Sequence, residues 1–146
     1  MFSLRLLSAS STIEPFLMST GPHTKLLVVD DEPIIVEFLV TSLSSGRCKI
    51  EVAFDGAEAI EKARVFRPEF VLTGQVMPKI GGLEAAVEIL RFLPQCKFVF
   101  VTSNANEAWF LAEYTEKGFD PQFLLSKPFQ RAHLLAVMAQ RGFPVP

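Results

Sequence analysis

The chain has 146 residues, which is the length of one ordinary domain. Its 14 Lys and Arg residues stand against 16 Asp and Glu residues, and the formal net charge of -2 excludes a dedicated nucleic-acid binder. Hydrophobic residues make up 49% of the chain and charged residues 21%, which excludes intrinsically disordered and collagen-like proteins.

Residues 1–24 form an extension that lacks the pattern of a signal peptide. Its apolar run at 4–7 is short and is interrupted by Arg5. Two interpretations are open: a weakly ordered extension with Met18 as the true start of translation, or a short helix that docks on the domain or on a partner. The apolar side chains available for such docking are Phe2, Leu6, Leu7, Phe16 and Leu17.

Residues 25–141 alternate short apolar runs with helical patterns, which is typical of β/α units around a parallel sheet. Strands are predicted at 26–29, 50–54, 70–73, 97–101 and 123–125. Helices are predicted at 57–66, 82–92, 106–117 and 129–140. A further helix begins at Pro33, stops at Gly46 and places Ile34, Ile35, Phe38, Leu39 and Leu43 at helical spacing. The pattern predicts one doubly wound α/β domain, with 142–146 as a tail.

Polar residues follow three of the predicted strands. Asp30 and Asp31 come after the first strand, Thr102 after the fourth and Lys127 after the fifth. Each has an ordinary explanation, such as acids that cap the helix at Pro33. However, ligands of open parallel sheets bind beyond the carboxyl ends of the strands, so the combination predicts a site there. No glycine-rich phosphate loop follows the first strand, which argues against a nucleotide enzyme.

These residues resemble the receiver domain of two-component response regulators, the CheY-like family. The resemblance covers residue 25 to about residue 140 and is carried by 27–33 (Leu-Val-Val-Asp-Asp-Glu-Pro), Met77-Pro78 followed by Gly81-Gly82, Val101-Thr102-Ser103 and Lys127-Pro128-Phe129. It implies a flavodoxin-like fold with five parallel strands in the order 2-1-3-4-5.

The resemblance also implies roles for single residues. In such domains an acidic pair binds Mg²⁺, and an aspartate at the end of the third strand accepts a phosphoryl group from a histidine kinase. A hydroxyl and a lysine contact the phosphoryl oxygens. Asp30 and Asp31 match the acidic pair, Thr102 matches the hydroxyl and Lys127 matches the lysine.

The position that matches the phospho-acceptor, three residues before Met77, is Gly74. A glycine has no side chain to form an acyl phosphate, and its neighbours Thr73, Gln75 and Val76 are not carboxylates. Aspartyl phosphorylation at the usual place is therefore not expected. The aromatic residue that many receivers carry three positions before the lysine is also missing, because Leu124 stands there and Phe123 lies one place earlier.

The missing carboxylate changes the expected electrostatics of the pocket. Lys127 is left with Asp30 and Asp31 as partners, and such a contact would close the pocket without a metal. Mg²⁺ would have two carboxylates, the Val76 carbonyl and water, so weak binding is expected and no cofactor is required. Gly74 is also expected to leave a gap beside Thr102 for water or a small anion. The other interpretation is a merely vestigial pocket.

The expected function is that of a stand-alone, atypical receiver domain that is not an enzyme. The sequence ends at Pro146 without a DNA-binding or catalytic module, so output is expected to pass through a histidine kinase or another signalling protein. Two alternatives are a conventional phosphorelay receiver in which Gly74 is an engineered or erroneous substitution, and a small flavodoxin-like ligand-binding protein or enzyme. The latter would use Asp30, Asp31 and Lys127 without a cofactor loop.

A reducing compartment is expected from the cysteines. Cys48 and Cys96 have neither a Cys-x-x-Cys spacing nor a neighbouring histidine, which argues against a zinc site or a disulfide framework. No apolar run approaches the roughly 18 residues of a membrane span. The prediction is a cytoplasmic protein without membrane or nucleic-acid contacts.

The resemblance also implies an interaction face formed by the fourth helix, the fifth strand and the fifth helix. Its candidate residues are Trp109, Phe110, Tyr114 and Phe123. Neighbours on a helix point about 100° apart, so a narrow buried stripe cannot hide both Trp109 and Phe110. At least one exposed aromatic is expected, as an anchor for a homodimer or a partner, unless a broad apolar face buries both.

Overall fold

The computed structural model describes residues 23–146, and the interpretations of residues 1–22 lie outside this range. The elements are β1 (Thr24–Val29), α2 (Pro33–Leu43), β2 (Cys48–Ala53), α3 (Gly56–Phe66), β3 (Phe70–Gly74), α4 (Gly82–Phe92), β4 (Lys97–Thr102), α5 (Ala108–Glu116), the 3-10 helix η2 (Pro121–Phe123), β5 (Leu124–Ser126) and α6 (Arg131–Arg141). No helix within 23–146 is long and apolar enough to cross a membrane.

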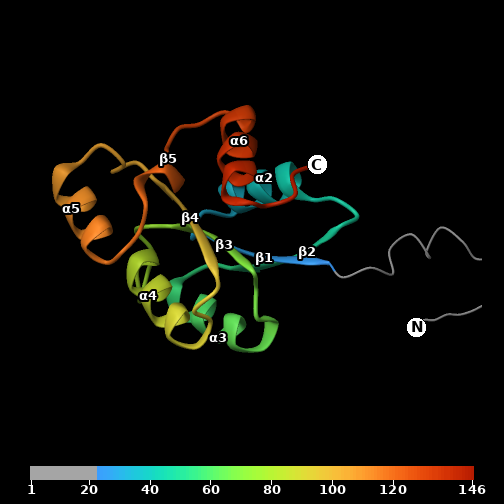
Figure 1. Ribbon diagram of the computed structural model, residues 1–146, viewed down its shortest axis with the longest axis horizontal. Helices are drawn as coiled ribbons and strands as arrows, with labels where there is room; N and C mark the ends of the chain where they lie inside the picture. Colours follow the sequence, from blue (N-terminus) through green and yellow to red (C-terminus); the bar gives the residue numbers. More distant parts are fainter. Residues whose placement is uncertain (1–22) are drawn as a thin grey trace, which may run out of the picture.

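The five strands form one parallel sheet in the order β2-β1-β3-β4-β5. Figure 1 shows α2 and α6 on one face of this sheet and α3 and α4 on the other. The core residues of α5 pack with those of α3 and α4. The predicted doubly wound, flavodoxin-like α/β fold and its strand order are confirmed.

The central strands are buried on both faces, which explains their unbroken apolar sequences. In β1, Leu27 and Val29 pack with α3 and α4, while Leu26 and Val28 pack with α2 and α6. The tail contributes Phe143 to the second group, edge-on to Phe70 at a centroid distance of 5.4 Å. Polar residues at the carboxyl ends of these strands are thereby held on a rigid support.

The inward stripe of α2 differs from the prediction. Ile34 and Phe38 belong to the apolar positions at helical spacing, but their exposed fractions are 80% and 38%. The buried apolar residues are Val36, Leu39 and Leu43. The first two turns of this helix are apolar almost all round, so helical spacing fits more than one stripe. The helix also ends at Leu43, three residues before Gly46, where the sequence predicts its stop.

The loops next to the sheet edge are fixed by close backbone approaches. A Cβ atom at Gly56 would overlap the carbonyl oxygen of Ile80, and one at Gly82 would overlap that of Gly74. The Gly82 amide donates to the Gln75 carbonyl at 2.8 Å. Glycine is needed at both positions because only hydrogen fits there, and the loop after β3 is consequently held against the sheet edge.

The aromatic residues of α5 divide between surface and core. Trp109 is 57% exposed, as expected for at least one of the pair, whereas Phe110 and Tyr114 are buried. The Tyr114 ring lies edge-on to Phe100 at a centroid distance of 5.2 Å. The expected interaction face is therefore wrong for Phe110 and Tyr114, because this side of the helix packs on the sheet. Phe123 is half-buried.

The two neighbours are expected to respond differently to truncation. Phe110→Ala should lower the free energy of unfolding by about 3–5 kcal/mol, because it leaves a cavity in the core. Trp109→Ala should cost less than about 1 kcal/mol. Urea denaturation measures both, and sedimentation of Trp109→Ala tests its role in a dimer. Equal losses of stability in the two variants would contradict this assignment.

Candidate functional site

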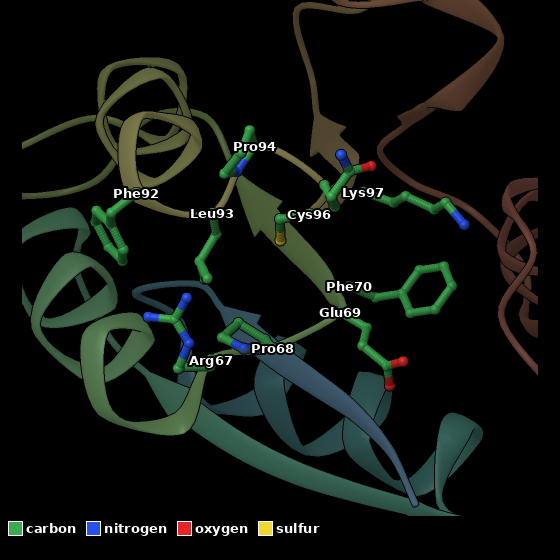
Figure 2. Close-up of a pocket in the computed structure, with 10 residues that line it drawn as sticks. Arg67, Pro68, Glu69, Phe70, Phe92, Leu93, Pro94, Cys96 and Lys97 are labelled. Atoms are coloured by element: carbon green, nitrogen blue, oxygen red, sulfur yellow. The ribbon is translucent and has the colours of Figure 1, made fainter.

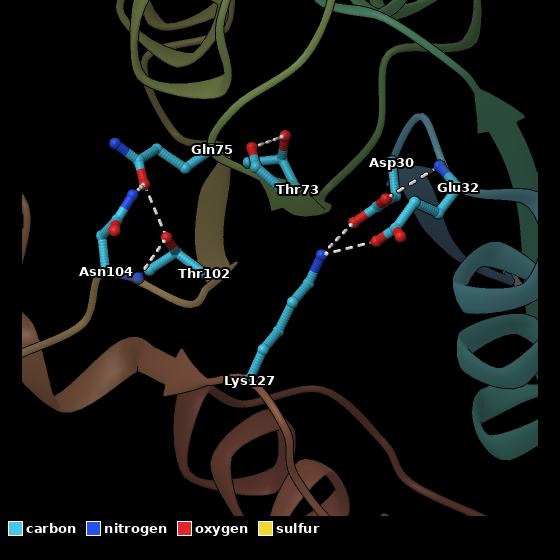
Figure 3. Close-up of polar contacts among 8 residues, drawn as sticks. Asp30, Glu32, Thr73, Gln75, Thr102, Asn104 and Lys127 are labelled. Atoms are coloured by element: carbon cyan, nitrogen blue, oxygen red, sulfur yellow. Dashed lines mark hydrogen bonds and ion pairs between the residues drawn. The ribbon is translucent and has the colours of Figure 1, made fainter.

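The predicted residues meet at the carboxyl edge of the sheet. Asp30 follows β1, Gly74 ends β3, Thr102 ends β4 and Lys127 follows β5. Figure 3 shows the Lys127 side chain extending toward the loop after β1, while Thr102 faces a separate polar group. The site thus consists of two hydrogen-bonded clusters.

The first cluster is centred on Asp30, which is only 1% exposed. The ammonium of Lys127 lies 3.2 Å from Asp30 Oδ2 and 3.3 Å from Glu32 Oε1. Asp30 Oδ1 accepts a hydrogen bond from the Glu32 amide at 3.0 Å. The expected contact between Lys127 and Asp30 is present, but the second partner is Glu32 and the prediction of Asp31 was wrong.

The acids do not cap the following helix. Glu32 is the N-cap of α2, and no side chain makes a capping hydrogen bond there. Asp31 is exposed. The ordinary explanation of the acidic pair as a helix cap is therefore wrong, because Asp30 turns toward Lys127 and Glu32 extends in the same direction.

Burial raises the pKa of the Asp30 carboxyl above its ordinary value. The Glu32 amide and the Lys127 ammonium oppose this effect, since both stabilise the charged carboxylate. The Glu32 amide and the positive charge of Lys127 together make an ionised carboxylate tolerable at this depth.

Gly74 lies directly against the Asp30 carboxylate. A Cβ atom at Gly74 would come 2.8 Å from Asp30 Oδ2, closer than carbon and oxygen normally approach. The expected gap does not lie at Gly74 itself, because Asp30 fills that space, and the open space beside Thr102 is lined by Gln75 and Lys127 instead.

The second cluster is centred on the Thr102 hydroxyl, which was expected to contact a phosphoryl oxygen. Thr102 Oγ1 donates to Gln75 Oε1 at 2.5 Å, and Asn104 Nδ2 donates to the same oxygen at 2.9 Å. The Asn104 amide donates to Thr102 Oγ1 at 3.0 Å. Neither partner was predicted from the sequence, although Gln75 directly follows Gly74.

A hollow of about 310 Å³ opens between the two clusters. Its lining residues are Asp31, Glu32, Gln75, Val76, Val101, Thr102, Ser103 and Lys127. Residues 23–146 contain no group of three acidic, histidine or cysteine side chains placed to hold a metal ion. Both oxygens of Asp30 already have partners. In this arrangement the residues do not fit a tightly held divalent cation.

The chain is similar to proteins of one known family. The family model "Response regulator receiver domain" matches residues 26–139. The response regulator GacA of Pseudomonas syringae pv. syringae is 40% identical over 80 residues, covering 53% of this chain and 37% of that protein. The response regulator MprA of Mycobacterium ulcerans is 32% identical over 114 residues, covering 78% of this chain and 48% of that protein. The chain thus spans less than half the length of these relatives.

Solved structures show the same fold. One is the CheX-CheY-BeF3-Mg complex of Borrelia burgdorferi, with a TM-score of 0.72 and 25% identity, covering 84% of this chain and 92% of that chain. The chemotaxis protein CheY4 of Vibrio cholerae has a TM-score of 0.73 and 24% identity, covering 81% of this chain and 98% of that chain.

Proposed function

The chain belongs to the response regulator receiver domain family of two-component signalling, and we propose that it signals by protein contact without aspartyl phosphorylation of its own pocket. Receiver domains are signalling modules rather than typical enzymes, and no catalytic role is proposed for this one. The observation that carries the proposal is Gly74, a residue without a side chain at the acceptor position.

The hydrogen bonds of the pocket support this proposal. The two groups expected to contact a phosphoryl group, the Lys127 ammonium and the Thr102 hydroxyl, already bind Asp30 and Gln75. Releasing them would leave buried polar groups without partners, which costs about 1–3 kcal/mol for each group. The pocket therefore favours one closed arrangement with its own side chains as ligands.

Phosphorylation tests the proposal directly. Incubation of the chain with acetyl phosphate and Mg²⁺ should add no phosphoryl group, because no carboxylate stands at position 74. Intact-mass measurement before and after acid treatment is the readout. An acid-labile phosphate in good yield would contradict the proposal and would favour a phosphorelay receiver with an acceptor elsewhere.

Magnesium binding is expected to be weak. Asp30 and Asp31, the Val76 carbonyl and water are the available ligands, and Asp30 is already paired with Lys127. Isothermal titration calorimetry should give a dissociation constant well above the low micromolar range. A low micromolar value would show that the cation displaces Lys127 from Asp30 readily.

A protein partner is the proposed receiver of the signal. Such a partner is a histidine kinase or another signalling protein, as CheY of B. burgdorferi forms a complex with CheX. Exposed apolar side chains suited to such contacts lie at Ile34, Phe38 and Trp109. Phe38 also lies 5.9 Å from Phe129, measured between ring centroids. We propose the cytoplasm as the compartment, supported by the free thiols of Cys48 and Cys96.

A further inference from the structure

The outward sides of α2 and α6 form one surface, the α2–α6 face. The two helices are neighbours on the same face of the sheet (Figure 1), and the ring centroids of Phe38 in α2 and Phe129 before α6 are 5.9 Å apart. Both helices begin at the carboxyl edge of the sheet, because each follows a strand of one parallel sheet, and they therefore run in the same direction. The residues of the α2–α6 face, all of them exposed, are Ile34, Glu37, Phe38, Arg131, Ala132, His133, Ala136 and Ala139.

The two helices differ in the size of their outward apolar side chains. α2 presents Ile34 and Phe38, which are large. α6 presents Ala132, Ala136 and Ala139, which recur at spacings of four and three and so share one side of the helix. Large apolar side chains pack well against small ones on a facing helix, because the small ones leave room for them. Each copy of the face therefore carries both halves of an apolar contact.

A hollow at the start of α6 adds to this complementarity. It has a volume of about 480 Å³ and is lined by Pro128, Phe129, Gln130 and His133. Ile34 lies in the first turn of α2, at the same edge of the sheet as this hollow. A side chain from the first turn of a second, parallel helix is therefore at the right height to enter it.

The two helices also differ in the sign of their charge. Glu37 is the only charged residue of α2, whereas α6 carries Arg131, His133 and Arg141 and no acid. Glu37 and Arg131 are exposed, and neither makes an ion pair within residues 23–146. The face is therefore complementary in charge to a rotated copy of itself.

We propose that the α2–α6 face binds the same face of a second copy of this chain. A two-fold axis parallel to the two helices places α2 of each copy over α6 of the other. Ile34 and Phe38 then lie against the alanines of α6, and Glu37 faces the basic first turn of α6. An axis that paired α2 with α2 would instead oppose two glutamates and leave the alanines uncovered.

The exposed Trp109 does not offer the same match. It lies on α5, whose only charged residues are Glu113 and Glu116. Pairing of α5 with α5 would oppose like charges, which disfavours association. The dimer is therefore assigned to the α2–α6 face rather than to the surface around Trp109.

The size of the α2–α6 face indicates a weak dimer. Each of the two helices has 11 residues. A pair of such helices spans roughly 16 Å by 20 Å, which lies at the small end of specific protein interfaces. We expect a dissociation constant of roughly tens of micromolar, so that monomer and dimer exchange with concentration.

Sedimentation velocity of the full chain, from about 1 to about 300 μM, tests the proposal. The unmodified chain should shift from monomer to dimer across this range. Ile34→Ser removes a large exposed side chain and should raise the dissociation constant by roughly tenfold without unfolding the chain. Val65→Ser is the matched control, because Val65 is also apolar and exposed but lies on α3, on the other face of the sheet. It should leave the dissociation constant unchanged.

A charge exchange tests the orientation of the dimer. Glu37→Arg and Arg131→Glu should each raise the dissociation constant by about threefold. An equimolar mixture of the two variants should associate as strongly as the unmodified chain, because opposite charges again face each other across the interface. Arg67→Glu is the matched control and should change nothing: Figure 2 shows Arg67 beside Pro68 in a hollow at the amino edge of the sheet, opposite to the start of α6.

The same measurements contain the results that would overturn the proposal. Monomers at every concentration would do so and would leave the face to a different protein. Equal losses of association in Ile34→Ser and Val65→Ser, or a mixture as weak as its two components, would do so as well. Trp109→Ala should leave the dimer intact, and a loss there would assign the dimer to α5. None of the exchanged residues lines the hollow between the two clusters, so the dimer and the absence of phosphorylation are tested independently.

Discussion

Gly74→Asp is expected to turn the pocket into one that binds Mg²⁺ and accepts a phosphoryl group. The new carboxylate would stand beside Asp30 and Asp31, and three carboxylates with carbonyl and water ligands suit a hard cation. Without metal, the variant should be less stable by about 1–3 kcal/mol, because its Cβ atom displaces Asp30 Oδ2 and like charges repel. Saturating Mg²⁺, at about 100 times the dissociation constant, should raise the free energy of unfolding of this variant by about 2.7 kcal/mol.

Thermal unfolding with and without Mg²⁺ measures the loss of stability and its recovery on metal binding. Intact mass after treatment with acetyl phosphate measures the gain of phosphorylation. Gly74→Asn is the matched control, because it introduces the same crowding of Asp30 without the negative charge. It should lose stability, gain nothing from Mg²⁺ and remain unphosphorylated. If Mg²⁺ also fails to stabilise Gly74→Asp against thermal unfolding, the hydrogen bonds of Lys127 and Thr102 hold the pocket closed more strongly than proposed.

The fold could be predicted because its signals are local and repeated. The unbroken apolar runs of β1 and β3 are typical of strands covered on both faces, and Asp55 caps α3 by accepting from the Glu58 amide at 2.8 Å. The inward stripe of α2 could not be predicted, since its apolar residues lie on more than one side. Which side faces inward is decided by packing against the sheet, and a single sequence does not reveal it.

The site could be predicted only where backbone topology decides the contact. Asp30 and Lys127 follow strands whose ends meet at one edge, so their proximity follows from strand order. The contacts of Gln75 with Thr102 and of Glu32 with Lys127 depend instead on how short loops turn after each strand. Loop conformation depends on contacts between residues several positions apart, such as the close approach of Gly82 to Gly74. No residue pattern in the sequence predicts these contacts.

Lys127→Met is expected to lower the free energy of unfolding by about 3 kcal/mol at neutral pH, because it leaves the buried carboxylate of Asp30 without a counterion. Methionine keeps most of the side-chain volume, so lost packing contributes little. Lys79→Met is the matched control: Lys79 lies 3.5 Å from Asp55, but its side chain is 70% exposed. Such a surface pair should cost less than about 1 kcal/mol.

The pH dependence distinguishes a lost ion pair from a merely structural defect. Burial already holds the pKa of folded Asp30 above its ordinary value, and removing Lys127 should raise it further. A folded state that binds the proton more tightly than the unfolded state gains stability as pH falls through the folded pKa, and loses it as pH rises. The deficit of Lys127→Met should therefore be largest at neutral pH and shrink in mildly acidic buffer. Urea denaturation across this pH range is the measurement, and Asp30→Asn/Lys127→Met should show no such recovery; a deficit independent of pH would show that Asp30 is not the group destabilised.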